Sequence, residues 1–334
     1  MKLSAPSGTR YATVDLLKIL LTVGIVFRHA ELVGQAGLDA AYDALSHGIQ
    51  LLTELCVPLF FVLSGFLFFR NPPERADFRF FRDKLRRRIR TLLVPYLIAN
   101  VFAFLAYWAA WRFAPGMMDG YFGDSWRNPL FVFWTGPVNL SLWFIRDLFL
   151  ALLLAPLYWL LVRFTRFWGV LVLGLFWYLT GTPAWCNFFF VLGAWAAVSR
   201  TDIAGACRKT GPWWLLLYLC CFAAAWRDPA LTKLSVLAGL PLCLAAADRL
   251  VRTLRREIPS DRQAWVFFIY LYHYIPVLAL KKLLPQAIGP DSFPALLGCY
   301  LLTALLTLGL LSGLYAALKR FTPRAAAILV GGRQ

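Results

Sequence analysis

Acidic residues are scarce in this chain of 334 residues, which has 17 Asp and Glu against 34 Lys and Arg and only 15% charged residues in all. Soluble domains carry about a quarter charged residues. A chain that is 60% hydrophobic would also expose large apolar patches to water. No long polar stretch remains for a separate soluble domain. These shortages predict one integral membrane domain over residues 1–334, with its core at roughly 11–318.

Signatures of several other protein classes are missing as well. The seven cysteines include no C-x-x-C pair and lie mostly in apolar runs, so we expect packing rather than a disulfide framework. There is no P-loop and no G-x-G-x-x-G motif, and we expect no metal. A formal net charge of +17 would suit nucleic acid, but the cations lie between apolar runs. That placement favours membrane lipids as partners and no nucleic acid.

Apolar runs recur along the whole chain, and about 20 apolar residues are enough for a helix to cross the hydrocarbon layer. Backbone polar groups in lipid must bond internally, and the runs lack the alternation of a barrel, so we expect an all-α polytopic helical bundle. About ten transmembrane helices are predicted: Val14–Val33, Leu45–Phe69, Thr91–Trp111, Leu142–Val162, Phe167–Gly181, Ala184–Val198, Pro212–Trp226, Leu231–Ala247, Ala264–Leu280 and Phe293–Leu318. Prolines within them predict kinks at Pro58, Pro95, Pro156, Pro241 and Pro276.

Basic residues are distributed unevenly between the predicted loops. With the N-terminus inside, most of the 34 lysines and arginines fall on the cytoplasmic side, including a dense block from Arg82 to Arg90. The positive-inside rule therefore predicts that both termini are cytoplasmic. Topology alone would explain most of these charges, and anionic lipids and an anionic cytosolic substrate are the partners that they suit.

Ionisable residues within the apolar runs are costly in a membrane, so each is a candidate for function. Lys18 and His29 are eleven residues apart, which at about 100° and 1.5 Å per residue places them on one helix face roughly 16 Å apart. Asp15 is expected to pair with Lys18 at i,i+3. The structural alternative is a pair of side chains reaching the membrane ends and a histidine satisfied by packing.

Later runs hold further polar candidates. The second run places His47, Gln50 and Glu54 on one face of its outer half, where functional and structural roles are both open. Ser64 precedes Gly65 in an apolar helix, a pattern that favours close helix packing. The remaining candidates are Trp143, Arg146, Asp147 and His273.

The basic block before the third run carries more cations than topology requires. Its members Arg87, Arg88 and Arg90 would suit a phosphate-bearing ligand, because guanidinium forks match phosphate oxygens. A solvated block facing lipid headgroups is the competing interpretation.

Taken in order, these motifs resemble the membrane acyltransferase 3 family. That family has a basic residue and a histidine spaced like Lys18 and His29 in its first helix, although Lys stands here where Arg is commonest. Residues 57–67 resemble its second-helix motif nearly letter for letter, and Arg87 and Arg90 match its Arg-x-x-Arg. Residues 142–148 and 269–273 are similar to its later landmarks. Lys18 keeps the positive charge but lacks the planar fork of Arg, so a role as a point charge is retained.

The resemblance implies transfer of an acyl group, commonly acetyl, from cytosolic acyl-CoA to a hydroxyl of a carbohydrate or glycolipid acceptor. His29 would be the catalytic base or a transient acyl carrier, with Lys18 placing the donor and Glu54 orienting the imidazole. The arginines of the basic block would hold the CoA phosphates. A bacterial inner-membrane location and separate extracytoplasmic or glycan-biosynthesis partner proteins are expected.

Two other classes of function are compatible with the same residues. Intramembrane His, Glu and Arg side chains also line the substrate paths of transporters, so a flippase for a glycan or lipid-linked precursor is one alternative. A membrane protein that binds a ligand without catalysis is the other.

Overall fold

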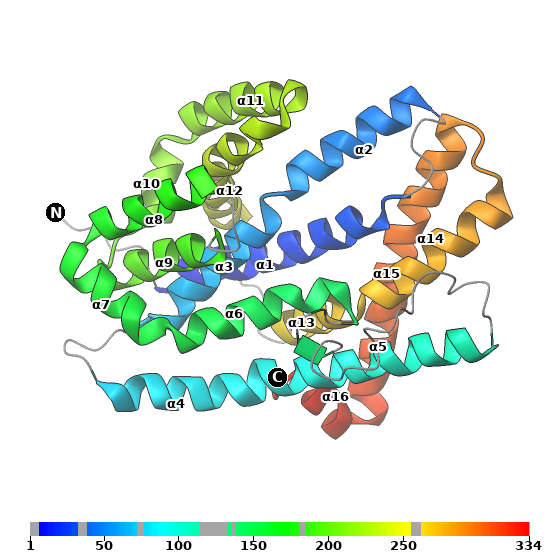
Figure 1. The fold of residues 1–334 in the computed structure, drawn as a ribbon, viewed down its shortest axis with the longest axis horizontal. Helices are drawn as coiled ribbons and strands as arrows, with labels where there is room; N and C mark the ends of the chain where they lie inside the picture. The colour runs from blue at the N-terminus through cyan, green and yellow to red at the C-terminus, as the bar shows by residue number, and fades with distance from the viewer. Residues whose placement is uncertain are drawn as a thin grey trace.

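Helices and their connections make up the described part of the chain, which contains no strand in this computed structural model (Figure 1). The structure describes residues 7–32, 39–71, 77–113, 133–134, 136, 138–180, 185–254 and 262–333. The predicted all-α class is confirmed for these residues.

In chain order the elements are α1 (Ser7–Ala30), α2 (Ala40–Thr53), α3 (Cys56–Phe68), α4 (Phe78–Arg88), η1 (Ile89–Leu93), α5 (Val94–Phe113), η5 (Leu140–Leu142), α6 (Trp143–Leu153), α7 (Ala155–Thr165), α8 (Phe167–Thr180), α9 (Trp185–Val198), α10 (Ile203–Lys209), α11 (Gly211–Arg227), η6 (Pro229–Leu231), α12 (Thr232–Leu254), α13 (Arg262–Tyr272), α14 (Tyr274–Ile288), α15 (Phe293–Phe321) and α16 (Pro323–Leu329).

Several described helical segments are long and apolar enough to cross a membrane. Four pass by length and composition alone, or six if each bent helix pair counts as one span. The four are Ala40–Phe68, Phe78–Phe113, Pro229–Leu254 and Phe293–Phe321, and the bent pairs are α6 with α7 and α13 with α14. The predicted number of ten spans and the predicted side of the termini stay predictions.

Several helix breaks lie just before or beside a proline. A proline ring cannot donate a backbone hydrogen bond and clashes with the carbonyl four residues earlier. The helix breaks shortly before Pro58, the α6–α7 pair bends by 61° beside Pro156, and the α13–α14 pair bends by 56° before Pro276. Before Pro95 the chain widens into the π turn η1. Helix α12, in contrast, continues through Pro241.

Helix α1 lies at the centre of the bundle. It contacts α2, α3, α12, α13, α14 and α15, and it runs through the middle of the molecule in Figure 1. Its buried side chains include Leu17, Leu21, Ile25 and Val26. Of the side chains described on α1, from residue 12 onward, no polar one is classed as exposed.

Two glycines bring α3 and α9 into backbone contact. A Cβ atom on Gly65 would lie 2.0 Å from the Phe190 carbonyl oxygen, and one on Gly193 would lie 1.9 Å from the Val62 carbonyl oxygen. Only hydrogen fits at either position. The close helix packing predicted at Ser64-Gly65 is therefore present, with Gly65 as its cause.

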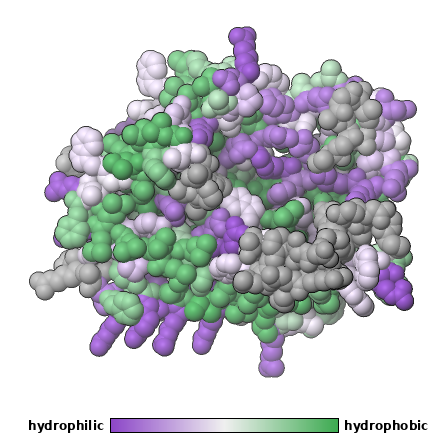
Figure 2. All heavy atoms as spheres, in the orientation of Figure 1, coloured by the Kyte–Doolittle hydropathy of each residue, from purple (hydrophilic) through white to green (hydrophobic). Residues whose placement is uncertain are grey.

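Large apolar side chains are exposed on the outer helices. Trp168, Val172 and Leu175 on α8 are each at least half exposed, as are Phe102 and Leu105 on α5. In Figure 2, hydrophobic side chains cover the part of this face formed by α7 and α8, while hydrophilic side chains project in a row along α4. An apolar surface of this extent belongs in lipid.

Candidate functional site

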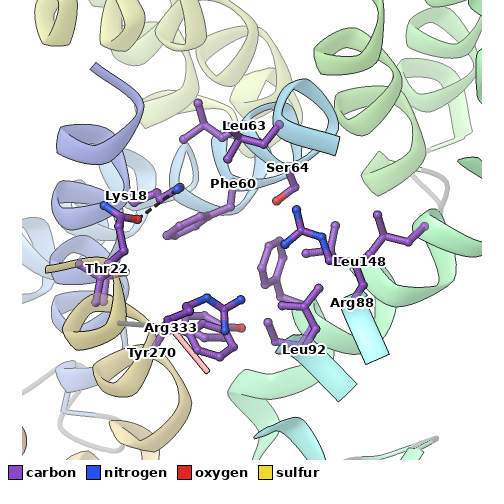
Figure 3. A pocket seen from close by; sticks show the side chains of 17 residues that line it. Lys18, Thr22, Phe60, Leu63, Ser64, Arg88, Leu92, Leu148, Tyr270 and Arg333 are labelled. Atoms are coloured by element: carbon purple, nitrogen blue, oxygen red, sulfur yellow. Dashed lines mark hydrogen bonds between the residues drawn. The ribbon is translucent and has the colours of Figure 1, made fainter. Parts of the chain in front are cut away.

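Lys18 and Thr22 of α1 point into a cavity of about 160 Å³ (Figure 3). The cavity lies between α1, α3, the junction of α4 and η1, α6, α13 and the residues after α16. Its lining is largely apolar, with a few polar side chains and cations, and no Asp or Glu is among the described residues that form it. Such a cavity has the positive charge to hold an anion and the apolar walls to hold a chain.

The ammonium of Lys18 is held by two neighbours. Lys18 Nζ lies 3.5 Å from the Asp15 carboxylate, so the predicted i,i+3 pair is present. The same nitrogen donates a 3.1 Å hydrogen bond to Gln263 Oε1 on α13. An ammonium has three N–H donors, which leaves one for the cavity.

Of the three arginines proposed for phosphate, Arg88 lines the cavity, whereas Arg87 and Arg90 are exposed and absent from its described lining. The reason lies in helical phase. Phe81, Leu85 and Leu92 turn inward, and Arg88 falls on that same stripe at the i+3 and i+4 spacings of one helix face. Of the three, Arg88 alone is among the described residues of the cavity lining, and the predicted phosphate-binding roles of Arg87, Arg88 and Arg90 stay predictions. The apolar stripe was the signal in the sequence that identifies Arg88.

His29 lies two turns beyond Thr22 on α1, outside the cavity lining. Its ring centroid is 5.3 Å from that of His273 and 5.4 Å from that of Tyr274. Lys18 thus meets Gln263 while His29 meets His273, so α1 and α13 run in the same direction. The predicted common face of Lys18 and His29 is the face that α13 and the start of α14 cover.

His273 has a defined tautomer. It is fully buried at the break between α13 and α14, and its Nδ1 lies 2.9 Å from the Tyr270 carbonyl oxygen. A carbonyl oxygen only accepts hydrogen bonds, so Nδ1 carries the proton and Nε2 is left as an acceptor. Among the described residues, Nε2 has no hydrogen-bond partner. A buried acceptor without a hydrogen-bond partner costs free energy, so its presence calls for an explanation such as a functional role.

Glu54 is paired with Arg28 instead of His29. Arg28 Nη2 donates a 2.6 Å bond to the Glu54 carboxylate, and Arg28 Nη1 donates to the Gln50 carbonyl oxygen at 3.0 Å. In the described chain, Glu54 and His29 form no hydrogen bond, so the expected triad-like contact is not formed.

The other candidates are placed as follows. Ser64 lines the cavity and points towards Arg88 in Figure 3. Arg146 Nε lies 2.7 Å from the Asp147 carboxylate, and Trp143 packs against the main hydrophobic core. His47 packs against Trp226 with ring centroids 4.9 Å apart.

Sequence reasoning missed two residues of the cavity. Gln263 binds Lys18 from the start of α13, and Arg333 reaches the cavity from beyond α16. Neither belongs to a motif, and their place depends on chain segments that lie about 245 positions from Lys18 or further.

Apolar helices around an internal cavity that several cations line define this protein as a multi-pass membrane protein. The chain matches the acyltransferase domain family over residues 11–313, and it belongs to that acyltransferase 3 family. The protein is therefore an acyltransferase. It is 29% identical, over 357 aligned positions covering 96% of this chain and 92% of the relative, to the succinoglycan biosynthesis protein ExoH of Rhizobium meliloti (strain 1021). No solved structure matches the chain.

Proposed function

We propose that the protein transfers an acyl group, most simply acetyl, from cytosolic acyl-CoA to a hydroxyl of an exported or cell-surface polysaccharide. Family membership supports acyl transfer. The relative named for succinoglycan biosynthesis supports a polysaccharide acceptor. One observation carries the rest: a single face of α1 presents Lys18 to a cation-lined cavity and presents His29, about three turns further on, to His273.

The donor is proposed to bind with its phosphates at Lys18 and Arg88. Both cations line the cavity, and guanidinium and ammonium groups bind phosphate oxygens strongly in a water-poor site. Arg87 and Arg90, exposed on the same helix, would raise the local concentration of the anionic donor without contacting it. The flexible arm of coenzyme A would then carry the thioester along the apolar walls towards His29.

At His29 two routes lead to the same products. As a base, the imidazole takes the proton of the acceptor hydroxyl while the oxygen attacks the thioester carbonyl. The new C–O bond forms, the C–S bond breaks, and the coenzyme A thiolate leaves and takes up a proton. As a carrier, the imidazole nitrogen first attacks the thioester carbonyl, the C–N bond forms as the C–S bond breaks, and the coenzyme A thiolate leaves with the proton that the acylated ring gives up. The acceptor hydroxyl then attacks the acyl-imidazole, the C–O bond forms as the C–N bond breaks, and the hydroxyl proton returns to the imidazole. In both routes the acceptor of His273 Nε2 is available to orient the His29 ring.

The wider arrangement belongs to the same proposal. We place the protein in the bacterial inner membrane as a single domain over residues 1–334, with about ten spans and both termini cytoplasmic. The donor cavity then opens on the cytoplasmic half, where the basic block lies, and His29 stands nearer the outer side. Separate extracytoplasmic or glycan-biosynthesis proteins would present the acceptor.

Replacement of His29 by alanine tests the proposal. We expect His29→Ala to reduce transfer of radiolabelled acetyl from acetyl-CoA to polysaccharide by roughly 100-fold or more, because a positioned base contributes about 10²- to 10⁴-fold. His47→Ala is the matched control, since His47 packs against Trp226. Full transfer activity in folded His29→Ala would remove His29 from the mechanism. Substrate flux across the membrane that needs no acyl-CoA would indicate a transporter instead.

A further inference from the structure

The residues after α16 fold back against the basic helix. Gly331 and Gly332 have φ values of +67° and +74°, and a Cβ on Gly331 would lie 2.7 Å from the Thr91 Cα atom. These two glycines let the chain turn into close contact with η1, and the C-terminus lies beside the α4–α5 rod in Figure 1. Arg333 is brought to the cavity by this turn.

Arg333 is held at the cavity wall by two hydrogen bonds and an aromatic contact. Its Nη1 donates to the Thr91 carbonyl oxygen at 2.6 Å and to the Val330 carbonyl oxygen at 2.7 Å. The guanidinium carbon lies 3.7 Å from the centroid of the Phe267 ring. These contacts occupy one nitrogen and one face of the guanidinium, and leave N–H groups of the fork for another ligand.

The positive charge at this wall has no counter-ion in the described chain. Elsewhere, half-buried arginines are paired with carboxylates: Arg28 with Glu54 at 2.6 Å, Arg146 with Asp147 at 2.7 Å, and Arg252 with Asp248 at 2.8 Å. Arg88 and Arg333 have no such carboxylate among the described residues. Burial, together with the neighbouring Arg88, lowers the pKa of the Arg333 guanidinium to about 9, which leaves it charged at neutral pH.

Two further polar atoms on the cavity lining lack partners. Gln263 Nε2 and Thr22 Oγ1 are buried and make no hydrogen bond within the described residues. The amide nitrogen can only donate, and the hydroxyl can donate, so both suit an acceptor-rich ligand. These two atoms lack hydrogen-bond partners in the described chain, and the two arginines lack a carboxylate counter-ion there.

We infer that Arg333 and Arg88 together form a phosphate subsite, in which the C-terminal tail supplies one of the two guanidinium groups that bind the acyl donor. A phosphate presents several acceptor oxygens and negative charge to two guanidinium forks, and it would neutralise both cations. This inference rests on the proposed function for the identity of the donor. The family match ends at residue 313, so the tail is a part of the site that lies outside the family's common domain.

Binding of acetyl-CoA to the full-length protein in nanodiscs of zwitterionic lipid tests the subsite. We expect Arg333→Met to weaken acetyl-CoA binding by roughly tenfold, because it removes charge-assisted bonds to phosphate while keeping an apolar contact with Phe267. Acetyl-pantetheine, which has no phosphate, should bind both proteins equally. Arg324→Met is the matched control, since Arg324 is exposed on α16.

The outcomes separate this inference from the proposed function. Equal acetyl-CoA affinity in the wild type and R333M would overturn the phosphate subsite but not the proposal that acyl-CoA is the donor. A wild type that binds no acetyl-CoA would overturn both the subsite and the proposed donor. If R333M binds phosphatidylglycerol more weakly than the wild type does but binds acetyl-CoA equally well, the subsite holds the phosphate of a lipid headgroup. Arg333 would then have no role in binding the acyl donor. Thermal unfolding without ligand checks the fold, and Arg333→Gln, which retains an amide donor for the Thr91 carbonyl, replaces R333M if that variant does not fold.

Discussion

Individual residues on α1 and α13 show how one helix face can serve two tasks. Lys18 and Gln263 meet at one end, and His29 and His273 meet at the other, because the two helices run in the same direction. The eleven-residue spacing on α1 is nearly matched by the spacing from Gln263 to His273. Two parallel helices in register therefore present their polar residues as facing pairs, one pair at the cavity and one beyond it.

His273 is expected to act through His29 and not through the donor. We predict that His273→Phe, which keeps ring packing but removes the acceptor Nε2, lowers kcat for acetyl transfer roughly tenfold, because a misplaced imidazole loses catalytic orientation. The KM for acetyl-CoA should change by less than about twofold. Steady-state kinetics with His47→Phe as control separates the two constants. A raised KM with unchanged kcat would place His273 at donor binding instead.

Whole elements are positioned here by residues that carry no catalytic chemistry. Pro156 and Pro276 lie beside the two sharp bends, and the second bend leaves His273 at a helix end where its ring reaches the Tyr270 carbonyl. Gly65 and Gly193 set the distance between α3 and α9. Because Ser64 adjoins Gly65, the same contact determines how far α3 stands from Arg88 across the cavity.

The α3–α9 contact should be sensitive to a single methyl group. We expect Gly65→Ala to lower the free energy of unfolding by roughly 1–3 kcal/mol or more, because the new Cβ would lie 2.0 Å from a backbone oxygen and the helices would have to separate. Gly309→Ala on α15 is the control, since nothing lies within 4 Å of its added Cβ. Thermal unfolding in detergent compares them. Equal melting temperatures for the two variants would contradict the close contact.

At the scale of the whole molecule, the tail and the basic helix lie on the same side of the bundle. Arg333 binds the Thr91 carbonyl, so the C-terminal residues and the start of α5 are neighbours. The positive-inside rule assigns the basic block to the cytoplasm. On that prediction the tail is cytoplasmic as well, which is the side from which a cytosolic donor would enter.

This orientation predicts a pattern of thiol labelling in intact cells. In a background without native cysteines, Asp291→Cys, in the turn between α14 and α15, should react with a membrane-impermeant maleimide from outside. Arg324→Cys, exposed on α16, should react only after the cells are permeabilised. Labelling of Arg324→Cys in intact cells would reverse the orientation and would place the cavity on the wrong side for a cytosolic donor.

Local sequence pattern alone was enough to predict most helices of this protein, one shared helix face and several helix breaks. Apolar run lengths located most helices, because a helix in lipid satisfies its own backbone and needs no distant partner. The helical period placed Lys18 and His29 on one face, and i,i+3 spacing paired Lys18 with Asp15. Proline chemistry located the breaks near Pro58, Pro156 and Pro276, since each acts on the carbonyl four residues before it.

Distant contacts were decided only by the tertiary structure. Whether Glu54 meets Arg28 or His29, and whether Gln263 and Arg333 reach the cavity, depends on how helices far apart in sequence pack. The apolar stripe of α4 and η1 indicates that Arg88 faces inward, but only packing shows which side chains surround Arg88 at the cavity. A sequence states which residues share a helix face, whereas only packing determines what that face meets.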